Sequence, residues 1–286
     1  MFHNKRADRR HSMSKHLQKL LEIMHFLRTS PDGCAWTKEQ THQSLIPSLI
    51  EESYETVETI DNGKVDDDLR DELGDILLQV AFHAQLAQER KAFTFDDVAK
   101  AIVDKLERRY PTILGNEPNT LKTPQEIDRR WQEVKAEERR KKGIDPAKLS
   151  LLDGISSALP ALIRTQKFKE RVTKVGWQWP NVDALLGKVD EELDELKAEV
   201  QAENPDKKKI TAELGDVLLT LVDCAHWHGI DAEEALRTTV SRVEARFRHM
   251  EQALKDKGLA VMEATPEERR ALWNEAKALE RQKKAS

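Results

Sequence analysis

The stretch from Lys188 to Asp216 decides how this chain folds. It opens with Lys188-Val-Asp-Glu-Glu-Leu-Asp-Glu195, breaks at Asn204-Pro-Asp206 and closes with Glu213-Leu-Gly-Asp216. Apolar residues recur every three or four positions on both sides of the break: Leu185, Leu186, Val189, Leu193, Leu196 and Val200, then Leu214, Val217, Leu218, Leu221 and Val222. That period is typical of the apolar face of an amphipathic helix. The stretch therefore predicts two helices that close over a common core.

Acidic side chains lie beside both apolar faces. Glu192 and Glu195 are three residues apart and share a helix edge, with Glu191 one turn from Glu195. Glu213 and Asp216 repeat the spacing on the second helix. Like charges about 4 Å apart repel by roughly 4 kcal/mol at an effective dielectric near 20, so a cation is expected among them. Carboxylates without His or Cys select Mg²⁺, Mn²⁺ or Ca²⁺ over zinc. The simpler alternative is a solvated helix surface, since 35% of the residues are charged.

The same arrangement occurs earlier in the chain. Glu52 lies 20 residues before Glu72, and the corresponding interval in the later copy is 21 residues, so the two helices keep nearly the same phase. This repetition makes chance charge patterning a poor explanation. We therefore predict a second set of metal ligands, which are Glu51, Glu52, Glu55, Glu72 and Asp75.

The repetition continues downstream of the carboxylates. Lys105-Leu-Glu-Arg-Arg109 returns as Arg242-Val-Glu-Ala-Arg246. Three further residues return 142 positions later, namely Thr123 as Thr265, Trp131 as Trp273 and Lys135 as Lys277. The chain is thus a tandem duplication of one unit of roughly 130 residues.

Helical signals run through both copies, and strand signals are nearly absent. We predict an all-α fold made of two helical bundles. Thr123-Pro-Gln-Glu126 has the pattern of a capping box at the start of a terminal helix. The predicted organisation is a disordered tail at 1–14, an N-terminal domain at 15–142, a linker at 143–155 and a C-terminal domain at 156–286.

Composition narrows the classes of partner. The formal net charge is -5, which argues against a general affinity for nucleic acid, because its phosphate backbone needs a surplus of Lys and Arg. No apolar run approaches the roughly 20 residues that span a bilayer, and no signal peptide is evident. Cys34 and Cys224 fall at unrelated places in the two copies, so we expect neither a disulfide nor a Cys-based zinc site. We predict a soluble cytoplasmic protein without membrane or nucleic-acid partners.

Basic and aromatic residues recur downstream of each set of carboxylates. The basic ones are Lys105, Arg108 and Arg109 in the first copy and Arg242 and Arg246 in the second. Solvated helix charges would be the simpler interpretation, but their return beside a metal site favours phosphate contacts, for which Arg offers a bidentate fork. Lys135 and Lys277 are weaker cases of the same idea. Trp131 and Trp273 could stack on a nucleobase, although a Trp on a helix more often packs in a core or a dimer interface.

Together these residues resemble the MazG family of nucleoside triphosphate pyrophosphohydrolases in its two-repeat form. The resemblance rests on the Glu-x-x-Glu and Glu-x-x-Asp pairs in both halves, on Lys-Leu-Glu-Arg-Arg-Tyr-Pro at 105–111 and on the paired Trp-x-x-x-Lys ends. It implies hydrolysis of nucleoside triphosphates to monophosphate and pyrophosphate by a homodimer, whose four-helix core forms on dimerisation. This chain departs from the family at Arg242, where Lys is typical, and at Ala245, where Arg is typical.

The resemblance also implies site residues, and it favours the second repeat as the catalytic one. It assigns the metal to Glu192, Glu195, Glu213 and Asp216, and nucleotide contacts to Lys188, Arg242, Arg246, Trp273 and Lys277. In our mechanistic hypothesis, Mg²⁺, with Mn²⁺ as a substitute, orients a water for in-line attack at the α-phosphorus. Glu191 takes the proton of that water, with Glu192 beside it in the catalytic group. Two alternatives stay open: a pyrophosphohydrolase specific for dUTP or phosphoribosyl-ATP, and a non-catalytic helical protein that senses nucleotides or binds a partner.

Overall fold

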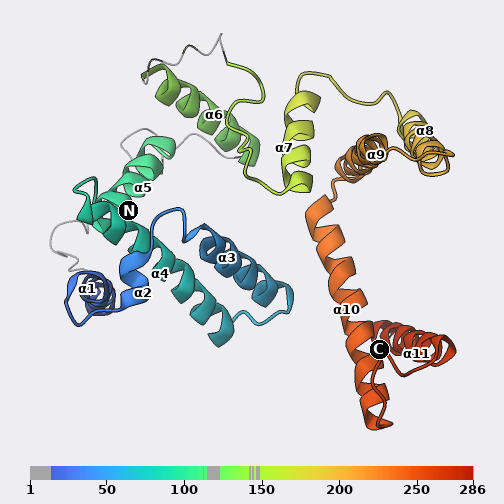
Figure 1. Cartoon of the computed structure of the whole chain (residues 1–286). Helices are drawn as coiled ribbons and strands as arrows, with labels where there is room; N and C mark the ends of the chain where they lie inside the picture. Colours follow the sequence, from blue (N-terminus) through green and yellow to red (C-terminus); the bar gives the residue numbers. More distant parts are fainter. Residues whose placement is uncertain are drawn as a thin grey trace. The chain divides into compact units, whose positions relative to one another are not determined.

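The computed structural model describes residues 14–111, 113–114, 123–141, 143, 145 and 149–285. Every regular element in these residues is a helix and no strand occurs among them, which confirms the all-α prediction (Figure 1). The chain divides into two compact units, Met1–Pro146 and Ala147–Ser286. Their boundary falls inside the predicted linker at 143–155. The predicted tail at 1–14 lies outside the described residues except for Ser14.

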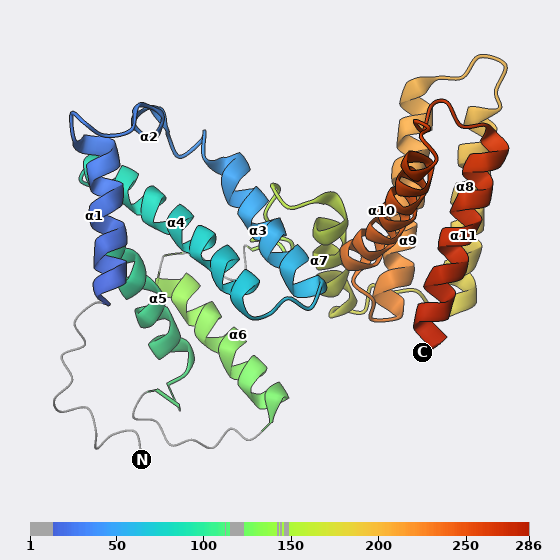
Figure 2. The same ribbon diagram turned by 90° about the horizontal axis from the view of Figure 1, so that it is seen from below.

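The first unit is organised around a helical hairpin. Its elements are α1 (Lys15–Thr29), α2 (Ala35–Glu39), α3 (Ile46–Asp61), α4 (Asp67–Glu89), α5 (Phe95–Arg109) and α6 (Pro124–Lys141). Helices α3 and α4 lie side by side, and α1 packs against α4 (Figure 2). Met24, Leu45 and Phe82 form the buried cluster that joins α1 to the C-terminal half of α4. Glu72 and Asp75 precede Phe82 on α4 by ten and seven residues, so they lie on the part of the hairpin before this cluster.

The second unit repeats the hairpin. Its elements are α7 (Ala161–Thr173), α8 (Val182–Val200), α9 (Lys207–Trp227), α10 (Ala232–Asp256) and α11 (Pro266–Ala285). Helices α8 and α9 pack against each other, and α7 packs against α9. A separate buried cluster of Met250, Leu254, Ala264 and Leu272 joins α10 to α11.

Short polar signals fix where several helices begin. The predicted capping box is present, because the Thr123 amide donates to Glu126 and the Glu126 amide donates to Thr123 Oγ1. The second repeat forms the same box with Thr265 and Glu268. Asn181 caps α8 by accepting a hydrogen bond from the Ala184 amide. These caps fix the residue at which each of the three helices begins.

Both hairpins leave part of their apolar faces in solvent. On α9, Leu214, Leu218 and Leu221 are each 47% exposed. Their counterparts on α4 include Leu73 and Leu77, which are also exposed. A contiguous exposed apolar face of this kind marks an interaction surface. None of the helices in the described part of the chain is both long and apolar enough to cross a bilayer.

Candidate metal and nucleotide site

The second hairpin brings three of the four carboxylates assigned to the metal together. One oxygen from each of Glu192, Glu213 and Asp216 lies within 4.8 Å of the others. Glu192 is 7% exposed, Glu213 is half-buried and Asp216 is exposed. Glu195, which we also predicted as a ligand, lies outside this group. Its position one turn beyond Glu192 keeps it on the same edge of α8.

Lys188 offsets part of this negative charge from within α8. Its Nζ lies 2.7 Å from Glu191 and 2.7 Å from Glu192. Hydrogen bonds to Glu191 and then to Glu192 hold the pKa of Lys188 above its ordinary value. Lys188, predicted to contact nucleotide, is thus already bound to the two residues that we predicted to be catalytic.

Repulsion within the cluster affects the pKa of Glu213. Partial burial and then the charges of Glu195 and Asp216 raise the pKa of this carboxyl. Since a divalent cation would stabilise the ionised form, the cluster has the electrostatic property expected of a metal site. The donor set is all oxygen, which fits Mg²⁺ or Mn²⁺.

The first hairpin also brings three carboxylates together, but not all of them are the counterparts of those in the second hairpin. Oxygens of Glu52, Glu55 and Glu72 lie within 4.8 Å of one another, while Glu51 and Asp75 lie outside the group. Burial and then the charge of Asp75 raise the pKa of Glu52. The position corresponding to Lys188 holds Ser48, so this cluster has no equivalent lysine.

The predicted phosphate contacts lie on other helices and are bound to acids. Arg109 donates to Glu138 and lies 4.6 Å from the ring of Trp131. In the second repeat, Arg246 donates to Glu280 at 2.6 Å and lies 5.9 Å from the ring of Trp273. Both repeats therefore build the same Arg–Glu–Trp group.

The remaining basic residues are distributed around these groups. Arg108 also donates to Glu138. Lys105 is exposed and lines a cavity together with Arg108 and Glu138. Arg242 donates to Thr239, and Lys135 and Lys277 are half-buried on α6 and α11. In the described residues, α5 packs against α4 and α6, and α10 against α7, α9 and α11. Among those residues, α5 does not pack against α3 and α10 does not pack against α8, the helices that carry the first acidic residues of each cluster.

Sequence comparison identifies the repeated unit. A model of the MazG nucleotide pyrophosphohydrolase domain matches residues 40–114 and again 181–251, which are the two hairpins and the helices that follow them. The chain belongs to the MazG family. It is therefore an enzyme of the nucleotide pyrophosphohydrolase class, which hydrolyses phosphoric anhydride bonds.

Two similar proteins align with nearly the whole chain. One is the nucleoside triphosphate pyrophosphohydrolase/pyrophosphatase MazG of Thermotoga maritima, 39% identical over 91% of this chain and 95% of its own length. Another is the nucleoside triphosphate pyrophosphohydrolase of Escherichia coli, 39% identical over 92% of this chain and 98% of its own length. The likeness therefore includes both MazG repeats.

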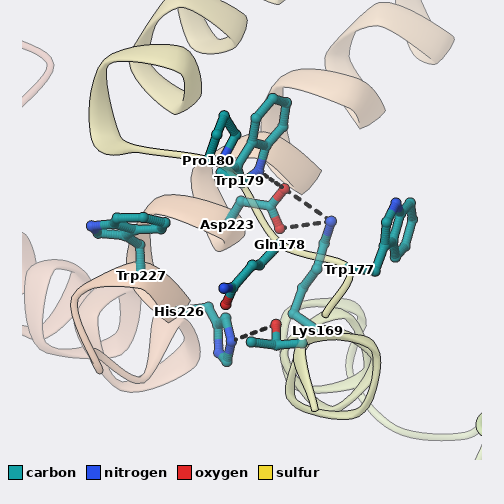
Figure 3. Close-up of a pocket in the computed structure, with 9 residues that line it drawn as sticks. Lys169, Trp177, Gln178, Trp179, Pro180, Asp223, His226 and Trp227 are labelled. Carbon is teal, nitrogen blue, oxygen red and sulfur yellow. Dashed lines mark hydrogen bonds and ion pairs between the residues drawn. The ribbon is translucent and has the colours of Figure 1, made fainter. Parts of the chain in front are cut away.

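Sequence reasoning missed the contacts that anchor the segments before each MazG hairpin. In the second repeat, the buried Asp223 accepts hydrogen bonds from Lys169 and from Trp179 Nε1 (Figure 3). In the first, Arg28 forms an ion pair with Glu89. Arg28 and Lys169 are 141 positions apart, so aligning the repeats could have singled out this basic pair.

A histidine pair was also missed in the first repeat. Nδ1 of His42 and Nδ1 of His83 lie 2.8 Å apart, and their rings are stacked. The two residues are 41 positions apart, and no local spacing rule connects a loop residue with a helix residue at that distance.

Proposed function

We propose that this MazG enzyme hydrolyses nucleoside triphosphates to the monophosphate and pyrophosphate with Mg²⁺, for which Mn²⁺ can substitute. Deoxynucleotides and non-standard nucleotides belong to the proposed substrate range. The observation that carries the proposal is the convergence of Glu192, Glu213 and Asp216 within 4.8 Å. Such a cluster attracts a divalent cation, and the triphosphate is the ligand class that such a cation holds in nucleotide enzymes.

In the proposed site, Glu192, Glu213 and Asp216 hold the metal, with Glu195 on the same helix edge. When bound, the metal acidifies a water and offsets the negative charge of the triphosphate. The oxygen of the attacking water forms a bond to the α-phosphorus, and the bond to the bridging oxygen between the α- and β-phosphorus breaks. Pyrophosphate leaves with that oxygen.

Glu191 is the proposed acceptor of the water proton. Its side chain is 56% exposed, and therefore open to solvent, and its carboxylate lies beside Glu192 through their common partner Lys188. When a nucleotide binds, Lys188 can exchange Glu191 for a phosphate oxygen, which frees the carboxylate to accept a proton. The two proposed roles are therefore linked: Glu191 becomes free to accept the proton when Lys188 binds the phosphate.

We further propose that the working unit is a homodimer. The evidence is the exposed leucines of α9, which would form a four-helix core with a second copy of the hairpin. Dimerisation would also supply neighbours for the basic groups of Arg242, Arg246 and Lys277, since α10 does not pack against α8 among the described residues. Trp273 belongs to the same nucleotide-contacting set. The two free thiols, Cys34 and Cys224, suit a reducing cytoplasm.

The first repeat is assigned a binding or structural role. Its second set of carboxylates, led by Glu52, Glu55 and Glu72, can hold a metal as well. We favour turnover in the second repeat, because Lys188 lies 2.7 Å from each of the two proposed catalytic glutamates, whereas Ser48 stands at its position in the first repeat.

The proposal is tested by hydrolysis in water labelled with ¹⁸O. The full-length protein is incubated with a panel of standard, deoxy and damaged nucleotides, with Mg²⁺ or with EDTA. Attack at the α-phosphorus places the label in the monophosphate, whereas attack at the β-phosphorus places it in pyrophosphate. Turnover of dUTP or phosphoribosyl-ATP alone would support a pyrophosphohydrolase specific for that nucleotide. Nucleotide binding without any turnover would support a non-catalytic protein that senses nucleotides.

A further inference from the structure

The C-terminal end of α9 carries a buried aspartate that the proposed metal chemistry does not use. Asp223 is 4% exposed, and its carboxylate accepts hydrogen bonds from Lys169 Nζ at 2.9 Å and from Trp179 Nε1 at 3.0 Å (Figure 3). The three residues line a cavity of about 620 Å³, together with the exposed indoles of Trp177 and Trp227. A buried charge is costly unless it is paired and hydrogen-bonded. These contacts therefore tie α7 and the segment before α8 to the end of α9.

The hydrogen bond from Trp179 lies at the start of the helix that supplies the first proposed metal ligand. Trp179 precedes Asn181, the N-cap of α8, by two residues. Glu192 follows that cap by eleven residues, about 16.5 Å along α8. On α9, Asp216 precedes Asp223 by seven residues, about 10.5 Å. The bond therefore fixes the end of the hairpin opposite its connecting loop, about two to three turns from the proposed ligands.

The two units differ in which carboxylate completes the acidic cluster. Two members of each cluster are counterparts of each other, and the third is not. In the second unit the third member is Asp216, which lies three residues from Glu213 in the direction of Asp223. In the first unit it is Glu55, which lies three residues from Glu52 in the direction of the loop between the helices. The cluster of the second unit therefore extends towards the end of the hairpin that the buried aspartate holds.

The first unit holds its entry segment at a different place. Phe82 stands at the position of Asp223, so the hydrogen-bonding carboxylate is missing there. Arg28 holds the segment instead, because it donates to the Gln40 carbonyl and to Glu89. Glu89 follows Phe82 by seven residues, which places this anchor about 10.5 Å farther from the acidic residues of α4. The unit with the nearer anchor is thus the one whose cluster extends towards it.

We propose that Asp223 is a positioning residue for the metal site of the second unit. The hydrogen bond that it accepts from Trp179 sets how far α8 lies along α9, and thereby brings Glu192 next to Asp216. The loop between the helices is one residue longer in the second unit, so it gives the two hairpins no common register. The identity of the ligand, a divalent cation, rests on the proposed function. Because Mg²⁺ demands near-ideal octahedral geometry with oxygens about 2.0–2.1 Å away, a small displacement of one helix weakens its binding.

The test measures Mn²⁺ binding by electron paramagnetic resonance, which needs neither nucleotide nor turnover. All full-length proteins carry Glu72→Gln, which removes one carboxylate of the first cluster and leaves the second as the main site. Trp179→Phe keeps an aromatic ring but deletes the donated hydrogen bond. It should weaken Mn²⁺ binding about tenfold, the lower end of the range for a partner that orients a metal ligand. Trp177→Phe, the same substitution on an exposed ring of the same segment, is the matched control and should leave the affinity unchanged.

A second variant removes the acceptor of the hydrogen bond instead of the donor. Asp223→Leu combined with Lys169→Met replaces the buried ion pair with apolar side chains, an exchange that is often neutral or stabilising. It should weaken Mn²⁺ binding as Trp179→Phe does. Metal-free thermal unfolding shows that each variant folds. A loss of affinity without a matching loss of thermal stability separates positioning of the ligands from general destabilisation.

The outcomes separate this inference from the proposed function. If both folded variants bind Mn²⁺ as tightly as the Glu72→Gln protein, or if Trp177→Phe loses as much affinity as Trp179→Phe, the inference is overturned and the metal site stands. A Glu72→Gln protein that binds no Mn²⁺ would refute the metal site and with it both proposals. Binding that depends on Trp179, in a parent that releases no pyrophosphate, would refute the proposed hydrolysis and leave this inference standing.

Discussion

The two acidic clusters lie on equivalent pairs of helices, α3 with α4 and α8 with α9, but they differ in whether a lysine is bound to their carboxylates. In the second unit, Lys188 lies within hydrogen-bonding distance of Glu191 and Glu192. In the first, Ser48 occupies that position, and the pKa of Glu52 is raised by burial and by neighbouring carboxylates. A duplicated scaffold has therefore kept its carboxylates in both copies while placing an internal cation in only one.

The segments before the two hairpins are also anchored by different contacts. The first unit uses the Arg28–Glu89 ion pair, in which the arginine side chain is 6% exposed, and it has the apolar Phe82 at the position of Asp223. The second unit replaces Phe82 with Asp223, which binds Lys169 and Trp179. At this position the first unit has a packed aromatic contact, whereas the second has a polar anchor. The comparison predicts that equivalent substitutions in the two units will have unequal effects.

The largest difference is expected between Asp216 and its counterpart in the first unit, Asp75. Asp216→Ala should lower the rate of pyrophosphate release by about 100-fold or more, since even an outer partner of a metal ligand costs about 10–100-fold. Asp75→Ala should leave the rate within a few-fold of the parent, because we assign turnover to the second unit. Steady-state release of pyrophosphate with Mg²⁺ measures both. Equal losses from the two variants would contradict a single working site.

A smaller effect is expected from the arginine groups. Arg246→Ala should raise the KM for a triphosphate by about tenfold or more, because a hydrogen bond to a charged group contributes about 1.5–3 kcal/mol. Arg109→Ala should change KM much less. Glu280→Gln separates binding from folding, since it removes the partner of Arg246 and leaves the arginine in place. If Glu280→Gln raises KM as much as Arg246→Ala, the arginine acts through the fold.

Substitutions of Lys188 and of Ser48 test, through thermal stability, whether the lysine compensates the charge of the acidic cluster. Lys188→Met should lower the metal-free midpoint of thermal unfolding by about 2–4 °C. Mg²⁺ should then raise the midpoint more in Lys188→Met than in the parent, because the metal replaces the missing cation. Ser48→Lys should raise the metal-free stability of the first unit. Calorimetry with and without Mg²⁺ measures these shifts, and a smaller response to Mg²⁺ in Lys188→Met would exclude charge compensation by the lysine.

Local patterns predicted the helices, because helix period and capping depend on neighbouring residues. The Thr123 and Glu126 side chains, for example, need only each other to start α6. The carboxylate pairs were found for the same reason, since residues three apart share a helix face. Which of them approach within 4.8 Å depends on the packing of two helices, and spacing alone did not exclude Glu195 or Asp75 from the groups.

Contacts over long separations could not be read from the sequence. Trp179 and Asp223 are 44 residues apart, and their hydrogen bond requires the segment before α8 to fold back on the end of α9. The exposed Trp177 and Trp227 likewise reveal a cavity only once α7 and α9 are packed. The repeat did contain a usable signal, since an aspartate in place of Phe82 at a core position demands a partner.

The smallest predicted effect concerns the histidine pair of the first unit. A hydrogen bond between His42 Nδ1 and His83 Nδ1 requires one nitrogen to donate and the other to accept. The two rings therefore cannot carry a positive charge at the same time while this bond is kept. Burial and then the charge of His42 hold the pKa of His83 below its ordinary 6.5. The unfolded chain therefore binds a proton at a higher pH than the folded one. The stability of the first unit should fall as the pH drops below about 6.5 and continue to fall until it passes the lowered pKa.

Urea unfolding at pH 7.5 and at pH 5.0 measures this loss. The positions of the pair are Asp183 and Cys224 in the second unit, so its unfolding lacks this source of pH dependence and provides the internal control. His83→Gln should reduce the difference between the two pH values, because glutamine keeps hydrogen-bonding groups and cannot take up the proton. Since acid also protonates carboxylates in both units, the informative quantity is the change in that difference between parent and variant. An unaltered difference would show that other groups of the first unit cause its acid sensitivity.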